Sequence, residues 1–342
     1  MRYAAAICVA QLAAAGLLLS PSAAANLQRF EYTQPHMGTT ARIVVFGDER
    51  GRVDRAAGAA FGRIADLDRR LTDYREDSEL MRACREAAYH ETPLSDDVFR
   101  VVDAAQTLAV RTGGAFDVTT GPLTRLWRRA RRQGEMPDPH EWASARDLVS
   151  YRRMHVSRER RAIRLDKTGM RLDVGGIAKG YAADVALEML RTYGYTRAMV
   201  VVGGEVAVSD PPPDQRGWRV TLAPLGRITP PTSQLLISHS GVSTSGDAEQ
   251  WVDIDGVRYS HVLDPRTGMP LVHRTSVTIL ARNAMTSDML ATAVSVLGPR
   301  HGLALADSTP GAAGLMGVEM DNAVHWSSSR RWPAASAAVA RR

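Results

Sequence analysis

One segment, Asp173–Asp184 with the sequence DVGGIAKGYAAD, constrains the fold more than any other part of the chain. A strand turns here through two glycines directly into a helix, and the first N–H groups of such a helix are free to bind an anion. Lys179 adds a positive charge suited to phosphate. The spacing matches neither the GxxxxGK[ST] loop nor GxGxxG. A phosphate site and a glycine-rich structural turn are therefore equal alternatives from this pattern alone.

The composition is that of an ordinary globular protein. The chain has 342 residues, of which 44% are hydrophobic and 23% charged, enough for one large α/β body or two closely joined lobes. These values exclude a disordered chain and a protein with several membrane spans. The sequence contains no internal repeat and no long linker, so a single domain is expected over residues 26–326.

The first 25 residues differ from the rest. Arg2 precedes an apolar stretch from Ala4 to Leu19, and small residues lead up to Ala25. The stretch is short for a membrane span, which needs about 20 residues, so residues 1–25 are predicted to be a secretory signal peptide cleaved after about Ala25; the alternative is an uncleaved anchor. Cys8 lacks the context for lipid attachment. The protein is expected in the periplasm, without a lipid anchor and touching a membrane only peripherally.

Cysteine usage and charge exclude further classes. Only Cys84 remains after cleavage, so no internal disulfide forms, and the absence of CxxC or a Cys/His cluster excludes structural zinc and iron–sulfur centres. Five arginines lie within eight positions, at Arg125, Arg128, Arg129, Arg131 and Arg132. They could meet a phosphate, an acidic protein or a membrane surface, or be a solvated helix end. Nucleic acid is not expected as a partner, because no recognised binding motif accompanies the charge.

Apolar periodicity predicts alternating helices and strands. Residues repeated at intervals of three and four indicate helices over 53–71, 95–108, 181–190 and about 286–297, the last stopped by Gly298-Pro299. Strands are expected up to Phe46, over 199–202 and 276–281, as a pair within 164–174, and as antiparallel strands around Asp255-Gly256. Residues 327–342, rich in Ser, Ala and Arg, are predicted to be a mobile basic tail.

Asp288 and Thr292 form a second candidate site. They stand four residues apart and share one face of the last predicted helix. A carboxylate and a hydroxyl suit a hard cation such as Mg²⁺, which keeps water and substrate phosphates in its shell. The alternative is structural, since an acidic residue in a first helical turn complements the dipole and a helical Thr bonds its own backbone.

Two further polar segments have both functional and structural interpretations. His261, within SHVLDPRTG, has the pKa range of a general base, and Arg266 could hold a phosphate, but both also fit a well-specified turn. In Thr112–Asp117, TGGAFD, the glycine pair before Phe116 can shape a wall against the flat ring of a ligand, and Asp117 can accept hydrogen bonds from that ring. The structural alternative is a helix stop followed by a buried Phe.

Taken together, these segments resemble the ApbE-type FAD:protein FMN transferase family. The resemblance covers about Met37 to Gly298 and rests on eight blocks in order: MGT, LTDYREDSEL, TGGAFDVTTGPL, LDVGGIAKGYAAD, VVGGEVAV, TSGDAE, SHVLDPRTG and SDMLATAVSVLG. It implies an α/β (α+β) fold with two intimately joined lobes around a flavin cleft, of the ApbE/T-fold-like kind. It also implies Mg²⁺-dependent cleavage of FAD, transfer of FMN to a threonine or serine of an exported protein, and release of AMP.

The same resemblance assigns roles to individual residues. The residues that would line the FAD site are Met37, Tyr74, Ala115, Phe116, Asp117, Asp173, Lys179, His261 and Val262. Magnesium would be held by Asp288, Thr292 and the backbone carbonyl of Gly176. His261 and Asp288 are the two candidates for the catalytic base, although an Asp bound to a metal is a poor free base. The acceptor would be an exported protein with an Asp-x-x-[Ser/Thr]-Gly-Ala-[Ser/Thr]-like motif, such as a subunit of an ion-pumping redox complex.

The sequence departs from the family pattern at three places. Glu205 follows Gly-Gly where Asp or Asn is expected, Thr72 replaces the usual Ser, and Arg82-Ala-Cys84 stands where a Leu-Asn pair is common. Two alternative functions stay open at this point. One is hydrolysis of FAD to FMN and AMP, and the other is a non-catalytic exported flavin-binding protein. The intact Asp288 and Thr292 pair argues against a simple carrier, which has little need of a metal beside the pyrophosphate.

Overall fold

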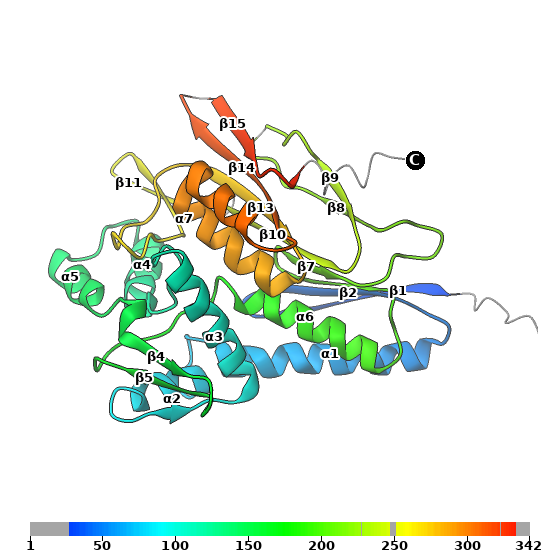
Figure 1. Cartoon of the computed structure of the whole chain (residues 1–342), viewed down its shortest axis with the longest axis horizontal. Helices are drawn as coiled ribbons and strands as arrows, with labels where there is room; N and C mark the ends of the chain where they lie inside the picture. The colour runs from blue at the N-terminus through cyan, green and yellow to red at the C-terminus, as the bar shows by residue number, and fades with distance from the viewer. Residues whose placement is uncertain (1–26, 227, 247–250, 322, 333–342) are drawn as a thin grey trace, which may run out of the picture.

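A computed structural model describes residues 27–226, 228–246, 251–321 and 323–332 (Figure 1). The predicted signal peptide lies outside these residues. The body is a sheet of eight strands in which every neighbouring pair is antiparallel. Across the sheet the order is β1 (Gln28–His36), β2 (Thr39–Gly47), β6 (Ala198–Val202), β7 (Glu205–Val208), β10 (Ser240–Gly246), β13 (Thr275–Ala281), β14 (Ala313–Met320) and β15 (Ala323–Ser328).

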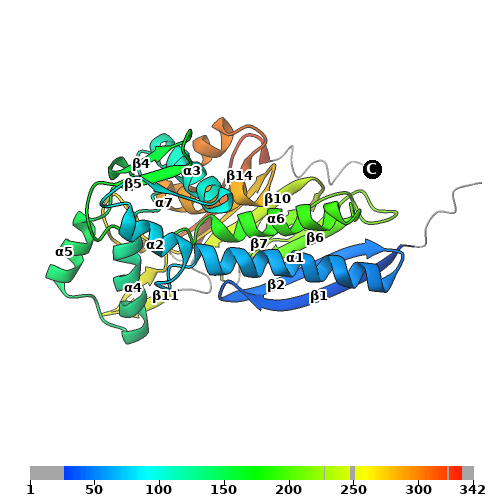
Figure 2. The same cartoon turned by 90° about the horizontal axis from the view of Figure 1, so that it is seen from below.

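Three long helices cover one face of this sheet. They are α1 (Arg50–Leu71), α6 (Ala178–Thr192) and α7 (Ala284–Ser308), and Figure 2 shows α1 and α6 side by side over β1, β2, β6 and β7. Their apolar stripes and the facing side of the sheet make one continuous core that includes Ile43, Ile64, Ala182 and Ile279. The hairpin of β8 (Trp218–Thr221) and β9 (Gln234–Ile237) covers part of the other face, over a second core around Trp218 and Leu315.

A smaller lobe stands at one end of the sheet (Figures 1 and 2). It contains α2 (Glu79–Glu86), α3 (Asp96–Arg111), α4 (Gly121–Gln133), α5 (Pro139–Asp147), the 3₁₀ turn η1 (Tyr151–Arg153), and a short sheet of β3 (Thr92–Pro93), β5 (Ala162–Leu165) and β4 (Met154–Ser157). The hairpin of β11 (Trp251–Ile254) and β12 (Val257–Ser260) packs on α4. Leu80, Val101 and Leu165 of the lobe belong to the main core, so the predicted α+β fold of two joined lobes is confirmed.

The first turn of α6 packs directly against the start of α7. A Cβ on Gly180 would lie 2.2 Å from the carbonyl oxygen of Ala284, so only glycine permits this approach. Asp184 then accepts hydrogen bonds from the N–H groups of Ala284 and Met285, both at 2.8 Å, and satisfies the exposed donors at the N-terminus of α7. The glycine-rich segment and the helix of Asp288 are thereby locked together.

One local prediction is wrong for a tertiary reason, and another is confirmed. The expected strand pair within 164–174 does not form: β5 pairs with β4 and β3 instead, and Arg171 makes a single bridge to Thr120. The predicted stop of the last helix at Gly298-Pro299 is confirmed. Gly298 takes a left-handed φ of 74° that breaks the helix, and helical structure resumes through Ser308. Within the described ranges, no helix combines the length and the apolar character needed to cross a membrane.

The predicted tail boundary at residue 327 also needs correction. β15 continues to Ser328, and Ser329 exchanges two hydrogen bonds with Gly314, from its N–H at 2.8 Å and to its Oγ at 2.9 Å. Trp332 is only 3% exposed, within the second core. Pairing with β14 and burial of this ring, neither of which composition reveals, hold residues 327–332 in place. Residues 333–342 of the predicted tail lie outside the described residues.

Trp332→Ala should therefore lower the free energy of unfolding by about 3–5 kcal/mol, the usual cost of emptying a buried tryptophan site. Trp251→Ala is the matched control, because Trp251 is 46% exposed and its contact with Arg258 contributes about 1 kcal/mol or less. Chemical denaturation of both variants measures the difference. Equal losses would contradict the packing of Trp332.

Candidate functional site

The glycine turn before α6 is held in place by Asp173. Its N–H donates to the carbonyl oxygen of Val118 at 2.7 Å, and its Oδ1 accepts from the N–H of Gly175 at 2.8 Å. The backbone then passes through Gly176 into the first turn of α6. The turn is thus well specified as a structure, and it also presents the N-terminus of α6 toward α7.

The three residues predicted to hold a metal are brought together at this turn. A Cβ on Gly176 would lie 2.9 Å from Oγ1 of Thr292, so the missing side chain lets the hydroxyl of α7 approach the backbone. Asp288 stands one turn earlier on α7, and its Oδ2 accepts from the N–H of Gly180 at 2.9 Å. A carboxylate, a hydroxyl and a backbone carbonyl are all hard oxygen donors, the chemistry that Mg²⁺ prefers. No group of three or more His, Cys, Asp or Glu side chains suited to a metal occurs in the described part of the chain.

Half-buried Lys179 and two buried carboxylates, Glu205 and Asp288, form a charge cluster beside this oxygen set. Nζ of Lys179 donates to Oε1 of Glu205 at 2.9 Å. Burial opposes the charge of Lys179, but the carboxylates of Asp288 and Glu205 outweigh it and hold the pKa of the amine above its usual value. Burial raises the pKa of Asp288 to about 7, although Lys179 acts in the opposite direction. The site therefore places one fixed positive charge and two carboxylates near the N-terminus of α6.

Glu205 leaves one buried acceptor without a partner. The residue is 5% exposed, and its Oε2 makes no hydrogen bond with any described residue. An unpaired buried acceptor costs about 1–3 kcal/mol, more when it carries charge. Such an oxygen beside Lys179 and Asp288 can accept a hydrogen bond from a ligand or bind a cation. The signal in the sequence was Glu205 after Gly-Gly, where the family pattern has Asp or Asn, but this departure did not predict a ligand contact for Glu205.

Ala115, Phe116 and Val262 form an apolar wall next to the oxygen set. All three are buried, and Ala115 and Val262 pack with Val296 of α7. Cε2 of Phe116 would lie 3.4 Å from a Cβ on Gly176, so the ring touches the glycine turn. The wall thus stands beside the proposed metal residues. A ligand that joins a flat ring to a phosphate needs this arrangement, with an apolar surface next to the phosphate site.

Both carboxylate oxygens of Asp117 accept hydrogen bonds from other groups of the protein. Oδ1 accepts from the N–H and Oγ1 of Thr119 at 2.8 and 2.7 Å, and Oδ2 accepts from the N–H of Tyr151 at 2.7 Å. Burial raises its pKa. Both oxygens therefore hold the loop that carries the apolar wall.

Arg128 organises the rim of the site, which Asp73, Tyr74 and Asp173 form, and the sequence had indicated it only as a member of the arginine run. Its guanidinium pairs with Asp73 and with Asp173, the latter at 3.0 Å, and lies 4.5 Å from the centre of the Tyr74 ring. Burial and the neighbouring Asp173 raise the pKa of Asp73. Tyr74 itself is 74% exposed. Its position in the arginine run, three residues after Arg125 and four before Arg132, was the only signal in the sequence for a role of Arg128.

The remaining predicted residues lie on three other segments. Met37 has a left-handed φ of 52°, and its N–H donates to Oδ2 of Asp68 near the end of α1 at 2.8 Å. His261 directly follows β12, whose last residue accepts a hydrogen bond from Trp127. Arg266 pairs with Asp264 of its own turn at 2.8 Å. Residues 247–250, which include part of the TSGDAE block, lie outside the described residues.

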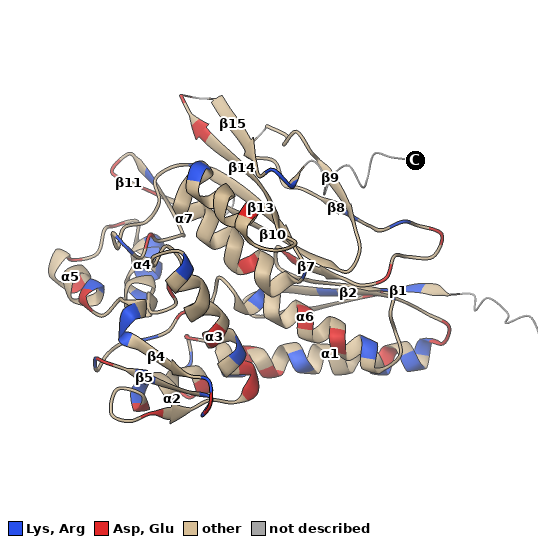
Figure 3. Cartoon of the chain, viewed as in Figure 1, with Lys and Arg blue, Asp and Glu red and all other residues tan. Residues whose placement is uncertain are grey.

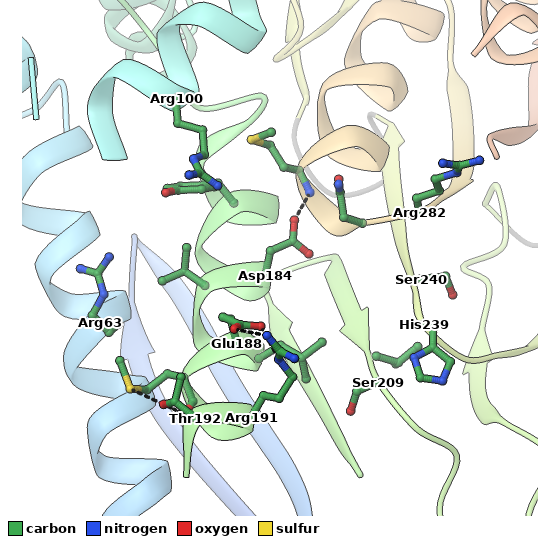
Figure 4. A pocket seen from close by; sticks show the side chains of 17 residues that line it. Arg63, Arg100, Asp184, Glu188, Arg191, Thr192, Ser209, His239, Ser240 and Arg282 are labelled. Atoms are coloured by element: carbon green, nitrogen blue, oxygen red, sulfur yellow. Dashed lines mark hydrogen bonds and ion pairs between the residues drawn. The ribbon is translucent and has the colours of Figure 1, made fainter. Parts of the chain in front are cut away.

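A separate groove of about 820 Å³ runs along the outer side of α6 (Figure 4). Its lining includes Arg63, Arg100 and Asp184 but none of the predicted metal residues. In Figure 4 Asp184 points toward the start of α7, away from Arg63. Burial raises its pKa to about 6, which follows from its role as a buried helix cap.

Comparisons with known proteins agree with this geometry. The model of the ApbE family matches residues 37–316. A FAD:protein FMN transferase of Vibrio cholerae serotype O1 is 31% identical over 303 residues, which cover 87% of this chain and 90% of that protein. One from Klebsiella pneumoniae (strain 342) is 30% identical over 269 residues, covering 77% of each chain.

Solved structures show the same fold. The flavin transferase ApbE from Vibrio cholerae superposes with a TM-score of 0.81 at 29% identity, over 90% of this chain and 99% of that one. The apo form of Pseudomonas stutzeri flavinyl transferase ApbE has a TM-score of 0.79 at 29% identity, over 91% and 97% of the two chains.

The raised pKa of Asp288 predicts a pH dependence of stability without metal. Its ordinary pKa is 3.8 and its folded pKa about 7, so between these values the folded state holds a proton that the unfolded state has released. The stabilisation is complete below about pH 4 and is lost as pH rises through 7. In EDTA, Asp288→Asn should lose less unfolding free energy than the parent between pH 5 and pH 8, as measured by denaturant titration.

Asp307→Asn is the control for this experiment. Asp307 lies on the same helix and pairs with Arg330 at 3.2 Å, far along α7 from the charge cluster. It should follow the pH profile of the parent. Parallel profiles for all three proteins would show that Asp288 is not the titrating group.

Proposed function

The chain belongs to the ApbE family, and from this premise we propose that it is a Mg²⁺-dependent transferase that cuts FAD and attaches FMN to a threonine or serine of an exported protein, releasing AMP. The observation that carries the proposal is the charge cluster of Lys179, Glu205 and Asp288 beside Gly176 and Thr292. It places a fixed cation, oxygen donors and an unpartnered acceptor where a helix begins. A pyrophosphate is the class of group that this combination suits.

The residues present fit a bound magnesium ion. Asp288, Thr292 and Gly176 supply only oxygen, and Oε2 of Glu205 is a buried acceptor close by. When bound, Mg²⁺ neutralises charge on the pyrophosphate and on the leaving phosphate. A further requirement is that Asp288 be ionised, which its pKa of about 7 allows at neutral and higher pH.

The reaction needs positioning more than covalent chemistry. The hydroxyl oxygen of the acceptor attacks the phosphorus of the FMN half, the bond from that phosphorus to the oxygen of AMP breaks, and the hydroxyl proton passes to a base. Lys179 offsets negative charge on the phosphates, because its pKa stays above the usual value despite burial. The wall of Ala115, Phe116 and Val262 excludes water and orients the flavin ring.

His261 and Asp288 are the candidates for the base. Asp288 already accepts a hydrogen bond from Gly180 and serves the cation, so proton transfer to it competes with its other role. Separate substitutions of the two residues, compared by their pH–rate profiles, distinguish them.

We place the reaction outside the cytoplasm. This part of the proposal rests on the predicted signal peptide, residues 1–25, and on the resemblance, which names exported acceptors such as subunits of ion-pumping redox complexes. Transfer to a threonine also distinguishes the enzyme from the two open alternatives. Release of AMP without acceptor would indicate FAD hydrolysis, and FAD that stays intact for hours with Mg²⁺ and acceptor present would indicate a carrier.

Mature protein mixed with FAD, Mg²⁺ and an acceptor domain that carries an Asp-x-x-[Ser/Thr]-Gly-Ala-[Ser/Thr] motif should add one FMN to the acceptor, measured by intact mass. EDTA should stop transfer and excess Mg²⁺ restore it. Asp288→Ala should slow transfer by about 100-fold or more, since it removes a group that stabilises transition-state charge. Asp307→Ala, on the same helix, should transfer at the parent rate. The proposal fails if the acceptor gains no FMN, or if Asp288→Ala matches the parent.

Arg128→Ala should weaken FAD binding by about 10-fold, because Asp173 and Tyr74 lose the cation that holds them at the rim. Arg129→Ala is the neighbouring control, since Arg129 is exposed and pairs with Glu141 on the other side of α4. Quenching of flavin fluorescence on titration measures both affinities. Equal affinities for the two variants would exclude this role of Arg128.

A further inference from the structure

The arginine run of α4 divides into an exposed and a half-buried part. Arg125, Arg129 and Arg132 recur at intervals of four and three and lie on one side of the helix, and Arg128 and Arg131 follow at the inner edge of that side. The first three are exposed and the other two are half-buried. Several blue segments of α4 are visible at the end of the molecule in Figure 3. Only the half-buried part is used by the rim of the site, so the exposed part is left without a role.

The exposed part borders a groove of about 780 Å³ between α4 and α5. Its cationic lining consists of Arg125, Arg129, Arg132 and Arg171, and its apolar lining includes Leu126 and Leu148. The two carboxylates of the groove are already engaged with groups of the protein. Asp138 caps α5 by accepting from two N–H groups at 2.9 and 3.0 Å, and Glu141 pairs with Arg129.

Two of the groove's cations form no ion pair with a described residue. Among the described residues, no carboxylate lies within salt-bridge distance of Arg125 or Arg132. Arg129 and Arg171 are paired with Glu141 and Glu76, so the excess positive charge around the apolar side chains comes from Arg125 and Arg132. A concave surface of this kind complements a segment with both carboxylate and apolar side chains.

The groove opens beside the rim of the candidate site. Arg171 lines the groove and also donates to Glu76 at 2.8 Å and to the carbonyl oxygen of Asp73 at 3.5 Å. Asp73 in turn pairs with the half-buried Arg128 of α4. The groove and the site are therefore separated by one helix, about 10–12 Å across with its side chains. A protein bound in the groove has its neighbouring residues within reach of the site.

We propose that the α4–α5 groove binds an acidic segment of the acceptor protein and so brings the acceptor hydroxyl to the site. This inference rests on the proposed transferase function and names the chemistry by which the acceptor is selected. A protein segment fits better than a membrane, since the cations surround a hollow with apolar side chains and do not form a flat face. It also fits better than nucleic acid, because no Phe, Tyr or Trp is among the lining residues on which bases would stack.

The test compares two double charge reversals of equal charge change. Arg125→Glu with Arg132→Glu alters the groove, and Arg52→Glu with Arg55→Glu alters exposed arginines of α1 at the other end of the long axis (Figure 1). The binding probe is a fluorescein-labelled octaglutamate peptide, followed by anisotropy at low salt, with octaglutamine as the neutral probe. The parent and the α1 variant should bind octaglutamate alike, and the groove variant at least 10-fold more weakly. Octaglutamine should bind none of them.

The second readout is transfer of FMN to the motif-bearing acceptor domain. The groove variant should raise the KM for acceptor about 10-fold at low salt, with the KM for FAD and kcat unchanged. In the parent the KM for acceptor should rise with salt, because screening weakens exposed charges. Arg125→Gln with Arg132→Gln, which removes charge without reversing it, should give an intermediate KM and keeps the test valid if the reversal variant folds poorly.

Three results would overturn the inference. One is equal octaglutamate affinity for the parent and the groove variant, and another is an unchanged KM for acceptor. The third is a groove variant that no longer binds phosphatidylglycerol vesicles but still binds octaglutamate like the parent. That result would assign the groove to a membrane surface. Failure of the parent to transfer FMN, with octaglutamate binding lost in the groove variant, would instead reject the proposed function and support the groove as an acidic-peptide site.

Discussion

The close approach of α6 to α7 is the contact on which the rest of the site depends. Gly180 has no side chain to separate the helices, Asp184 caps the first turn of α7, and Oδ2 of Asp288 accepts from the N–H of Gly180. These contacts determine where Thr292 stands relative to Gly176. A larger residue at position 180 would meet the carbonyl of Ala284 and push the two helices apart, and with them the oxygen donors.

The charge cluster at this junction is costly for the folded protein without a ligand. Asp288 is buried with a raised pKa, and Glu205 keeps an oxygen without a partner among the described residues, while the half-buried Lys179 balances part of their charge. Buried charges that are only partly satisfied lower stability unless a further partner arrives. We interpret the cluster as a site whose stability is completed by cation and pyrophosphate.

The arginine run shows how one helix can serve two surfaces. Arg128 is half-buried and holds Asp173 and Tyr74, whereas Arg125 and Arg132 are exposed and line the α4–α5 groove. In our proposals, the first contact serves flavin binding and the second serves selection of the acceptor. Placing both on one rigid helix keeps the two binding events at a constant separation.

The sequence alone determined the elements whose information is local. The apolar periodicity of α1, the Asp255-Gly256 turn and the glycine turn that leads from Asp173 into α6 were all predicted, because each depends on neighbours a few residues apart. The resemblance identified the family and named the residues that the fold brings together at Gly176 and Thr292.

Only the tertiary structure decided the features that depend on distant partners. β5 pairs with β4 and β3 and not with the next segment, and Trp332 is buried because the opposite face of the sheet accepts it. The oxygen of Glu205 that has no partner among the described residues, and the division of the arginine run of α4, likewise follow from contacts between segments far apart in the chain. Local patterns specify turns and helical faces, but burial and charge balance are properties of the assembled core.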